Sequence, residues 1–124
     1  MNQNDTIVAI ATPPGKGGVG IVRASGPGAK QVLMKWFRPI GGSIEPRRAV
    51  YGEVIGETGD RLDTGLGIFF ASPHSYTGED VVEFQLHGSP YVLRSLVDRI
   101  VDDGMARVAQ PGEFTRRAFE NGRL

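Results

Sequence analysis

The segment VVEFQLHGSPYVLRSLVDRIVDDG, residues 81–104, changes its hydrophobic period near the middle. In residues 81–88 the apolar side chains alternate with polar ones, as is typical of a β-strand that buries one face. From Ser89 the signals are those of a helix: a serine N-cap, a proline in the first turn and a glycine at the end. The apolar positions of this second part follow helical spacing, at Leu93, Leu96, Val97 and Ile100. A strand that leads directly into a helix predicts a domain that mixes the two kinds of structure.

The rest of the chain continues this mixture. Alternating or apolar runs predict strands, and apolar residues at helical spacing predict helices. Segments rich in proline, glycine and polar residues predict loops at 38–48 and 72–80. The other predicted elements are strands at 6–11, 19–25 and 106–109, helices at 28–37 and 111–124, and a hairpin at 49–71 with its turn at Gly59-Asp60. We therefore expect one α+β domain over residues 1–124, with a mixed β-sheet covered by helices.

Composition excludes several classes of protein. The 14 basic and 14 acidic residues balance, so no net charge favours nucleic acid or an acidic membrane. The chain has no cysteine, which excludes a disulfide framework and thiol chemistry. No apolar run reaches the length of a membrane span, and the first residues lack the pattern of a signal peptide. We expect a cytoplasmic protein without a membrane partner.

The glycine-rich stretch TPPGKGGVG, residues 12–20, follows an apolar run and could be taken for a phosphate-binding loop. A P-loop requires a lysine and a serine or threonine after its last glycine, to contact phosphate and magnesium. Ile21 and Val22 occupy those two positions here, and the following residues alternate as a strand does. The stretch is therefore predicted to be a turn between two strands.

The sequence offers no catalytic residue and no metal site. His74 and His87 are the only histidines, no cysteine accompanies them, and no HExxH motif is present. Nor can an ordered nucleophile, histidine and acid be assigned.

A few charged residues are candidates for a binding site. Glu83 lies in the polar phase of an otherwise apolar strand, and Arg23 has a similar place in GIVRASG. Arg116, Arg117 and Arg123 cluster near the end of the chain, where they are expected on a helix surface. The simplest interpretation of each is a solvated surface. The alternative is a pocket in which a carboxylate and guanidinium groups bind a heterocycle with amide-like edges and a carboxylate tail.

Three stretches together carry a resemblance to a known family. They are DTIVAIATPPGKGGVGIVRASG (5–26), SYTGEDVVEFQLHG (75–88) and PGEFTRRAFENGRL (111–124). In order and spacing they resemble the amino-terminal domain of the tRNA-modification GTPases called MnmE or TrmE. The likeness spans essentially the whole chain.

The resemblance implies a fold similar to the folate-binding domain of the glycine-cleavage aminomethyltransferases. It also implies a homodimer that binds 5-formyltetrahydrofolate or a related one-carbon tetrahydrofolate. By their place in the motifs, Arg23, Glu83 and Arg123 are expected to contact the folate.

The resemblance also implies that the complete family protein has a helical domain and a G domain, and we expect both to be absent from this chain. GTP, magnesium and potassium are expected only in that G domain, so the chain alone should not hydrolyse GTP. With an FAD-dependent partner, MnmG or GidA, the family modifies C5 of the wobble uridine of certain tRNAs, and tRNA is expected to bind the full-length complex.

The sequence departs from the family pattern at two positions. Ser89 replaces a frequent glycine, and Gln110 replaces a frequent arginine that would add a cation near the pocket.

Two other hypotheses about the function remain. One is a dimerisation scaffold without folate, in which the strand positions Val82, Phe84 and Leu86 and the pair Trp36-Phe37 form an apolar interface. The other is a folate-dependent aminomethyltransferase, which would need a catalytic acid that the sequence does not supply.

Overall fold

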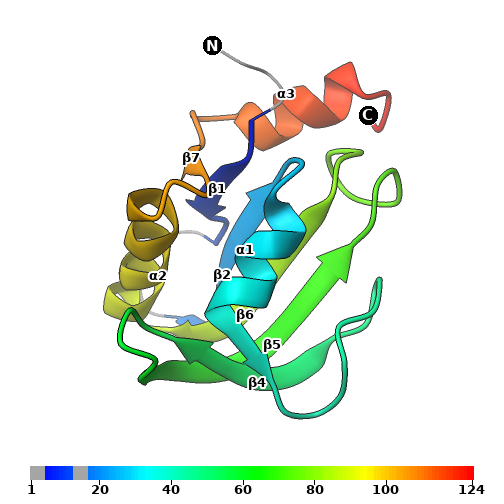
Figure 1. The fold of residues 1–124 in the computed structure, drawn as a ribbon. Helices are drawn as coiled ribbons and strands as arrows, with labels where there is room; N and C mark the ends of the chain where they lie inside the picture. Colours follow the sequence, from blue (N-terminus) through cyan, green and yellow to red (C-terminus); the bar gives the residue numbers. More distant parts are fainter. Residues whose placement is uncertain (1–4, 13–16) are drawn as a thin grey trace.

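The computed structural model describes residues 5–12 and 17–124, which form a mixed seven-stranded sheet and three helices (Figure 1). The strands are β1 (Ile7–Ile10), β2 (Gly17–Ser25), β3 (Phe37–Pro39), β4 (Val50–Ile55), β5 (Arg61–Phe70), β6 (Val81–Gly88) and β7 (Arg107–Val108). The helices are α1 (Ala29–Trp36), α2 (Pro90–Asp102) and α3 (Glu113–Glu120). This architecture confirms the predicted α+β class.

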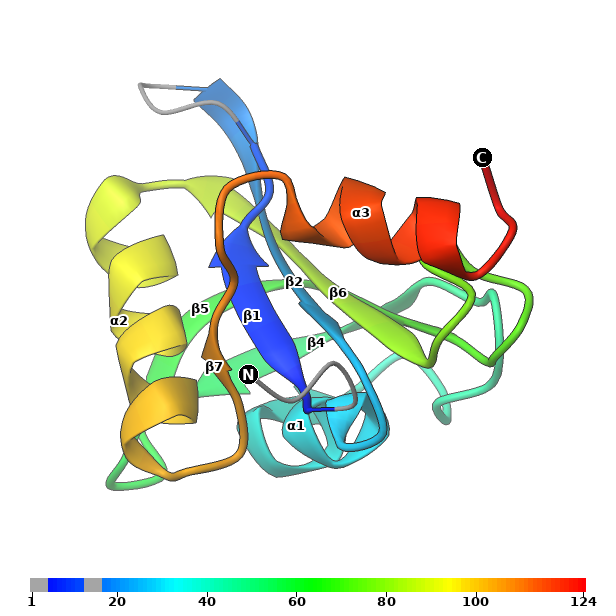
Figure 2. The same ribbon diagram turned by 90° about the horizontal axis from the view of Figure 1, so that it is seen from above.

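The strand order across the sheet is β3-β4-β5-β6-β2-β1-β7. All neighbouring strands pair antiparallel except β1 and β7, which are parallel. Figure 2 shows α2 and α3 on different sides of β1 and β2. The core lies between the sheet and the helices α1 and α2. Because side chains alternate along a strand, Arg23, which lies between the core positions Val22 and Ala24 of β2, points to the other face, toward α3.

The strand-to-helix segment folds as its sequence predicts. In α2 the four apolar positions at helical spacing are all buried. Pro90 is the first helical residue, and the backbone N–H of Val92 donates to Ser89 Oγ at 3.4 Å. Gly104, just after the helix, has a φ of 76°, a conformation that favours glycine. Local signals are sufficient to place both ends of this helix.

Replacing Ser89 by alanine should lower the free energy of unfolding by about 1 kcal/mol, because it removes the acceptor for an unpaired helix N–H. Chemical denaturation measures the change. Ser43→Ala, in an exposed loop, is the control and should change the free energy by less than about 0.5 kcal/mol. Equal effects of the two substitutions on the free energy of unfolding would contradict the role of Ser89 as the N-cap of α2.

One strand is missed from the sequence. The pattern predicts a helix to residue 37 and a loop after it, whereas the helix ends at Trp36 and Phe37 begins β3. Phe37 pairs with Val54 and Arg38 with Glu53 of β4. The neighbouring strand therefore stabilises β3, which the local sequence pattern does not predict. The final helix is also shorter than the predicted one, because α3 begins at Glu113 and ends at Glu120.

Two other predictions concern the hairpins. The turn of the β4–β5 hairpin is confirmed, with Gly59 at a φ of 84°. In the glycine-rich stretch, residues 13–16 lie outside the described part of the chain. The chain resumes at Gly17 as β2, a strand, in agreement with the prediction and in contrast to the helix that would follow a P-loop.

The prediction that five apolar residues form a dimer interface, as the scaffold hypothesis requires, is wrong. Its five residues, Val82, Phe84, Leu86, Trp36 and Phe37, are all buried in the core of the chain. Because they belong to one buried cluster, they are unavailable to a second copy in this fold.

Candidate functional site

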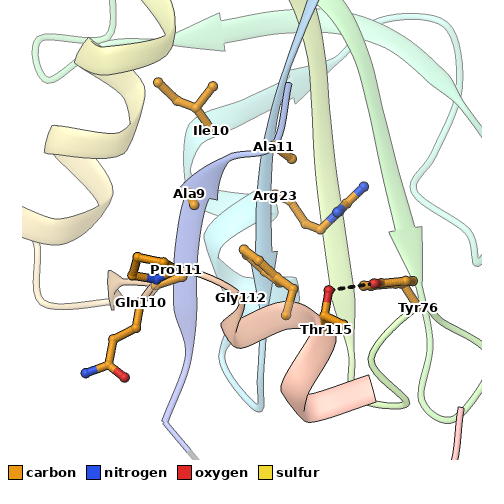
Figure 3. Close-up of a pocket in the computed structure, with 11 residues that line it drawn as sticks. Ala9, Ile10, Ala11, Arg23, Tyr76, Gln110, Pro111, Gly112 and Thr115 are labelled. Carbon is orange, nitrogen blue, oxygen red and sulfur yellow. Dashed lines mark hydrogen bonds between the residues drawn. The ribbon is translucent and has the colours of Figure 1, made fainter. Parts of the chain in front are cut away.

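An open cleft lies on the face of the sheet opposite the core helices (Figure 3). Its volume is about 380 Å³. It is lined by residues 9–11 at the end of β1, Arg23 of β2, Tyr76, and residues 109–112, 114 and 115 at the start of α3. Ala9 and Ala11 have small side chains, so the β1 wall leaves room above the sheet. The cleft thus combines one cation, the aromatic side chains of Tyr76 and Phe114, and the start of a helix.

Arg23 of the cleft forms an ion pair with Glu83, which is not itself among the residues that line the cleft. They are directly opposite each other in the antiparallel pair β2–β6, so their side chains leave the sheet on the same face. Nη2 and Nε of Arg23 donate to Glu83 Oε2 at 2.8 and 3.0 Å, and Nε2 of Gln85 donates to Glu83 Oε1 at 3.1 Å. The side chains are only 24% and 12% exposed, so this polar phase of the strand is not the freely solvated surface of the simplest interpretation.

Two aromatic rings flank the guanidinium of Arg23. Its Cζ lies 5.7 Å from the centroid of the Tyr76 ring and 5.8 Å from that of Phe114. At these distances the ring faces attract the cation. Tyr76 comes from the β5–β6 loop and Phe114 from the first turn of α3, so the site joins segments that are far apart in sequence.

Arg123 is not among the residues that line the cleft. Its Nε donates to the backbone carbonyl of Ser75 at 3.1 Å, next to Tyr76. Of the three predicted residues, the structure therefore brings Arg23 and Glu83 together and places Arg123 beside the loop that carries Tyr76.

A network of ion pairs holds α3 against the sheet. Glu113 is fully buried, and its Oε2 lies 2.6 Å from Arg107 Nη2 and 3.2 Å from Arg117 Nη2. Arg117, only 2% exposed, also contacts Asp5 at 3.0 Å and Glu79 at 3.1 Å. Arginines of α3 were expected on a helix surface, and for Arg117 that expectation is wrong, since the helix buries a charged stripe.

The network shifts the pKa values of its carboxyl groups. Hydrogen bonds from Arg107 are the largest influence and lower the pKa of Glu113 from 4.5 to about 2, against the opposing effect of burial. Hydrogen bonding to Arg107 also lowers the pKa of Asp5. Both groups are therefore ionised at neutral pH and compensate the buried guanidinium of Arg117.

Acid should destabilise the fold through this network. Because the pKa of Glu113 is lower in the folded chain, its contribution is complete above about pH 4.5 and is lost as the pH falls toward 2. At about 1.4 kcal/mol per pKa unit, the loss from Glu113 is about 3 kcal/mol. Chemical denaturation between pH 7 and 2.5 measures it. The Glu113→Gln variant should show a shallower dependence in this window, and an unchanged dependence would contradict the assignment.

The described residues hold no group of three or more His, Cys, Asp or Glu side chains that could bind a metal ion. Within the same residues, no helix has the length and apolar character of a membrane span. His87 is exposed and its Nδ1 lies 2.8 Å from Asp63 Oδ1.

The sequence reasoning missed Tyr76, Phe114 and Thr115 as cleft residues. Tyr76 and Phe114 each lie inside a motif, but nothing in the spacing shows that the two motifs meet. One signal in the sequence could have indicated them. Strand alternation puts Arg23 on the face opposite the core, and a cation on that face needs partners from other segments of the chain.

The fold and the cleft define an α+β domain with a mixed polar and aromatic cleft between its sheet and its last helix. Residues 6–123 match the family described as "GTP-binding protein TrmE N-terminus". The chain therefore belongs to this family.

Similar full-length proteins carry the name tRNA modification GTPase MnmE. The chain is 50% identical over 127 residues to that of Koribacter versatilis and 50% identical over 121 residues to that of Saccharophagus degradans. It is 49% identical over 120 residues to that of Thermotoga maritima. These alignments cover 100%, 98% and 97% of the chain, but only 28%, 26% and 26% of the relatives.

Proposed function

We propose that this chain is the amino-terminal domain of a tRNA-modification GTPase, and that it binds a one-carbon tetrahydrofolate in the cleft above Arg23. Family membership supports the first part. The observation that carries the second is the position of Arg23 in the cleft, paired with Glu83 and flanked by Tyr76 and Phe114.

The cleft suits a flat heterocycle with polar edges. Its volume of about 380 Å³ falls in the range of small-molecule sites, and its open form allows a longer tail to extend outward. The rings of Tyr76 and Phe114 offer apolar faces. Arg23 donates one N–H from Nε and one from Nη2 to Glu83, so the N–H groups of Nη1 and the second N–H of Nη2 can face a carbonyl or carboxylate of the ligand.

Glu83 needs a rearrangement to accept paired N–H groups from a ligand. A carboxylate offers about four acceptor sites. Arg23 takes two on Oε2 and Gln85 takes one on Oε1. A single ligand N–H can be accommodated directly, whereas a pair must displace Gln85 or Arg23. Arg123 would contact a ligand only at its outer end, beside Ser75.

The domain's chemical contribution in this proposal is to bind and orient the one-carbon carrier. We further propose that it forms a homodimer and acts in the cytoplasm with an FAD-dependent MnmG-type partner on C5 of the wobble uridine. GTP, magnesium and potassium would bind the G domain of the complete protein, so this chain alone would not hydrolyse GTP. These wider assignments rest on family membership alone.

Calorimetric titration with 5-formyltetrahydrofolate tests the folate proposal. We expect micromolar binding by the chain and a loss of about ten- to hundred-fold in Arg23→Ala, because charge-assisted hydrogen bonds are removed. Arg94→Ala, on the exposed face of α2, is the matched control and should bind as the unmodified chain does. A folded chain that does not bind, or an equal loss in both variants, would contradict the proposal.

A further inference from the structure

The backbone on both sides of Tyr76 is fixed. Ser75 and Thr77 are buried. Ser75 Oγ donates to the carbonyl of Glu79 at 2.5 Å, and Thr77 Oγ1 lies 2.7 Å from Ser25 Oγ. Between them the side chain of Tyr76 leaves the loop and is 44% exposed. The loop therefore presents one aromatic ring at the cleft from a rigid base.

A single hydrogen bond joins the tip of this ring to α3. Tyr76 Oη and Thr115 Oγ1 are 2.9 Å apart, and both residues line the cleft (Figure 3). Thr115 lies in the same helix as Glu113 and Arg117, whose ion pairs attach α3 to the sheet. The ring is thus held at its base by the loop and at its tip by a firmly attached helix.

This hydrogen bond adds little to the attachment of α3. Three other contacts already tie the β5–β6 loop to α3 or to the residues just after it: Arg117 to Glu79, Asn121 Nδ2 to the Thr77 carbonyl at 2.9 Å, and Arg123 to the Ser75 carbonyl. Both hydroxyl groups are near solvent, where water can replace either partner. What the bond does restrict is the direction in which the Tyr76 side chain points, so that its ring stays beside Arg23 in the cleft.

We propose that Tyr76 is a positioning residue of the cleft, and that its hydrogen bond to Thr115 holds the ring in the orientation that packs against the flat heterocycle of the ligand. The proposal rests on the proposed function, folate binding in this cleft. Without the bond the ring can rotate about its side-chain torsions, and binding must restrict that freedom. The effect therefore falls on ligand affinity and not on the stability of the fold.

The test compares 5-formyltetrahydrofolate affinities of the full chain and four variants. Tyr76→Phe and Thr115→Val each remove one hydroxyl group and should weaken binding about three- to ten-fold. The double variant should bind no more weakly than either single variant, because both lose the same bond. Tyr76→Leu, which also loses the ring, should weaken binding at least about ten-fold.

Melting temperatures and a distant tyrosine separate positioning from a general structural role. The two hydroxyl variants should melt within about 2 °C of the unmodified chain, since an exposed hydrogen bond contributes little to stability. Tyr91→Phe, at an exposed tyrosine on α2, should leave the affinity unchanged.

The outcomes distinguish this proposal from the folate proposal itself. Wild-type binding that depends on Arg23 but is unaffected by Tyr76→Phe and Thr115→Val would overturn the role of Tyr76 alone. So would losses that multiply in the double variant. A folded wild-type chain that does not bind folate would overturn the proposed function and this inference with it.

Discussion

Replacing Glu113 by glutamine is expected to lower the free energy of unfolding by about 3–5 kcal/mol. The Glu113 carboxylate is fully buried and accepts hydrogen bonds from Arg107, Arg117 and the backbone N–H of Gln110. Glutamine has one acceptor oxygen in place of two and no charge. The guanidinium of Arg117, which is also buried, would lose one of its three carboxylate partners without regaining water, and only Asp5 and Glu79 would remain.

Glu120→Gln provides the matched control for this substitution. It makes the same chemical change on the same helix at an exposed position. We expect a change of less than about 0.5 kcal/mol there. Urea denaturation at pH 7 measures both variants, and equal losses would contradict the view that buried charges hold α3 in place.

Replacing Phe84 by alanine is expected to cost about 3–5 kcal/mol through the cavity it leaves. Phe84 is fully buried in β6, and its ring meets Phe37 edge to face, with centroids 6.4 Å apart. It contacts the sheet and the helices in one core, so the surrounding side chains cannot all move to fill the space.

The control for Phe84 is Phe119→Ala, the same change at a residue that is 70% exposed. Its effect should stay within about 0.5 kcal/mol. Chemical denaturation of the two variants measures both changes in the free energy of unfolding. A small loss for Phe84 would mean that β6 does not form the centre of the core.

Local patterns were sufficient for most of the fold. The alternation in β6 and the serine, proline and glycine around α2 are signals contained in a few neighbouring residues, and these elements were predicted correctly. β3 was missed because its hydrogen bonds come from β4, and the proline and glycines near it indicate a loop. Tertiary pairing decides such a short strand.

The site could be predicted only in part, for the same reason. The sequence placed Arg23 and Glu83 in the polar phases of two strands, but only the register puts them opposite each other. The charged face of α3 resembles a solvated surface until Asp5 and Arg107, from distant parts of the chain, are brought against it. Tyr76 and Phe114 meet through the fold, and no spacing rule connects them.

The most direct test of the account is a set of ¹H–¹⁵N NMR spectra of the chain, recorded as 5-formyltetrahydrofolate is added. We predict that the largest shift changes fall on the backbone amides around the cleft, at Ala9, Arg23, Tyr76, Phe114 and Thr115. Amides at the far end of β6 and the exposed start of α2 should change little. An absence of shift changes at saturating ligand, or changes that cluster away from Arg23 and Tyr76, would contradict a folate site in this cleft.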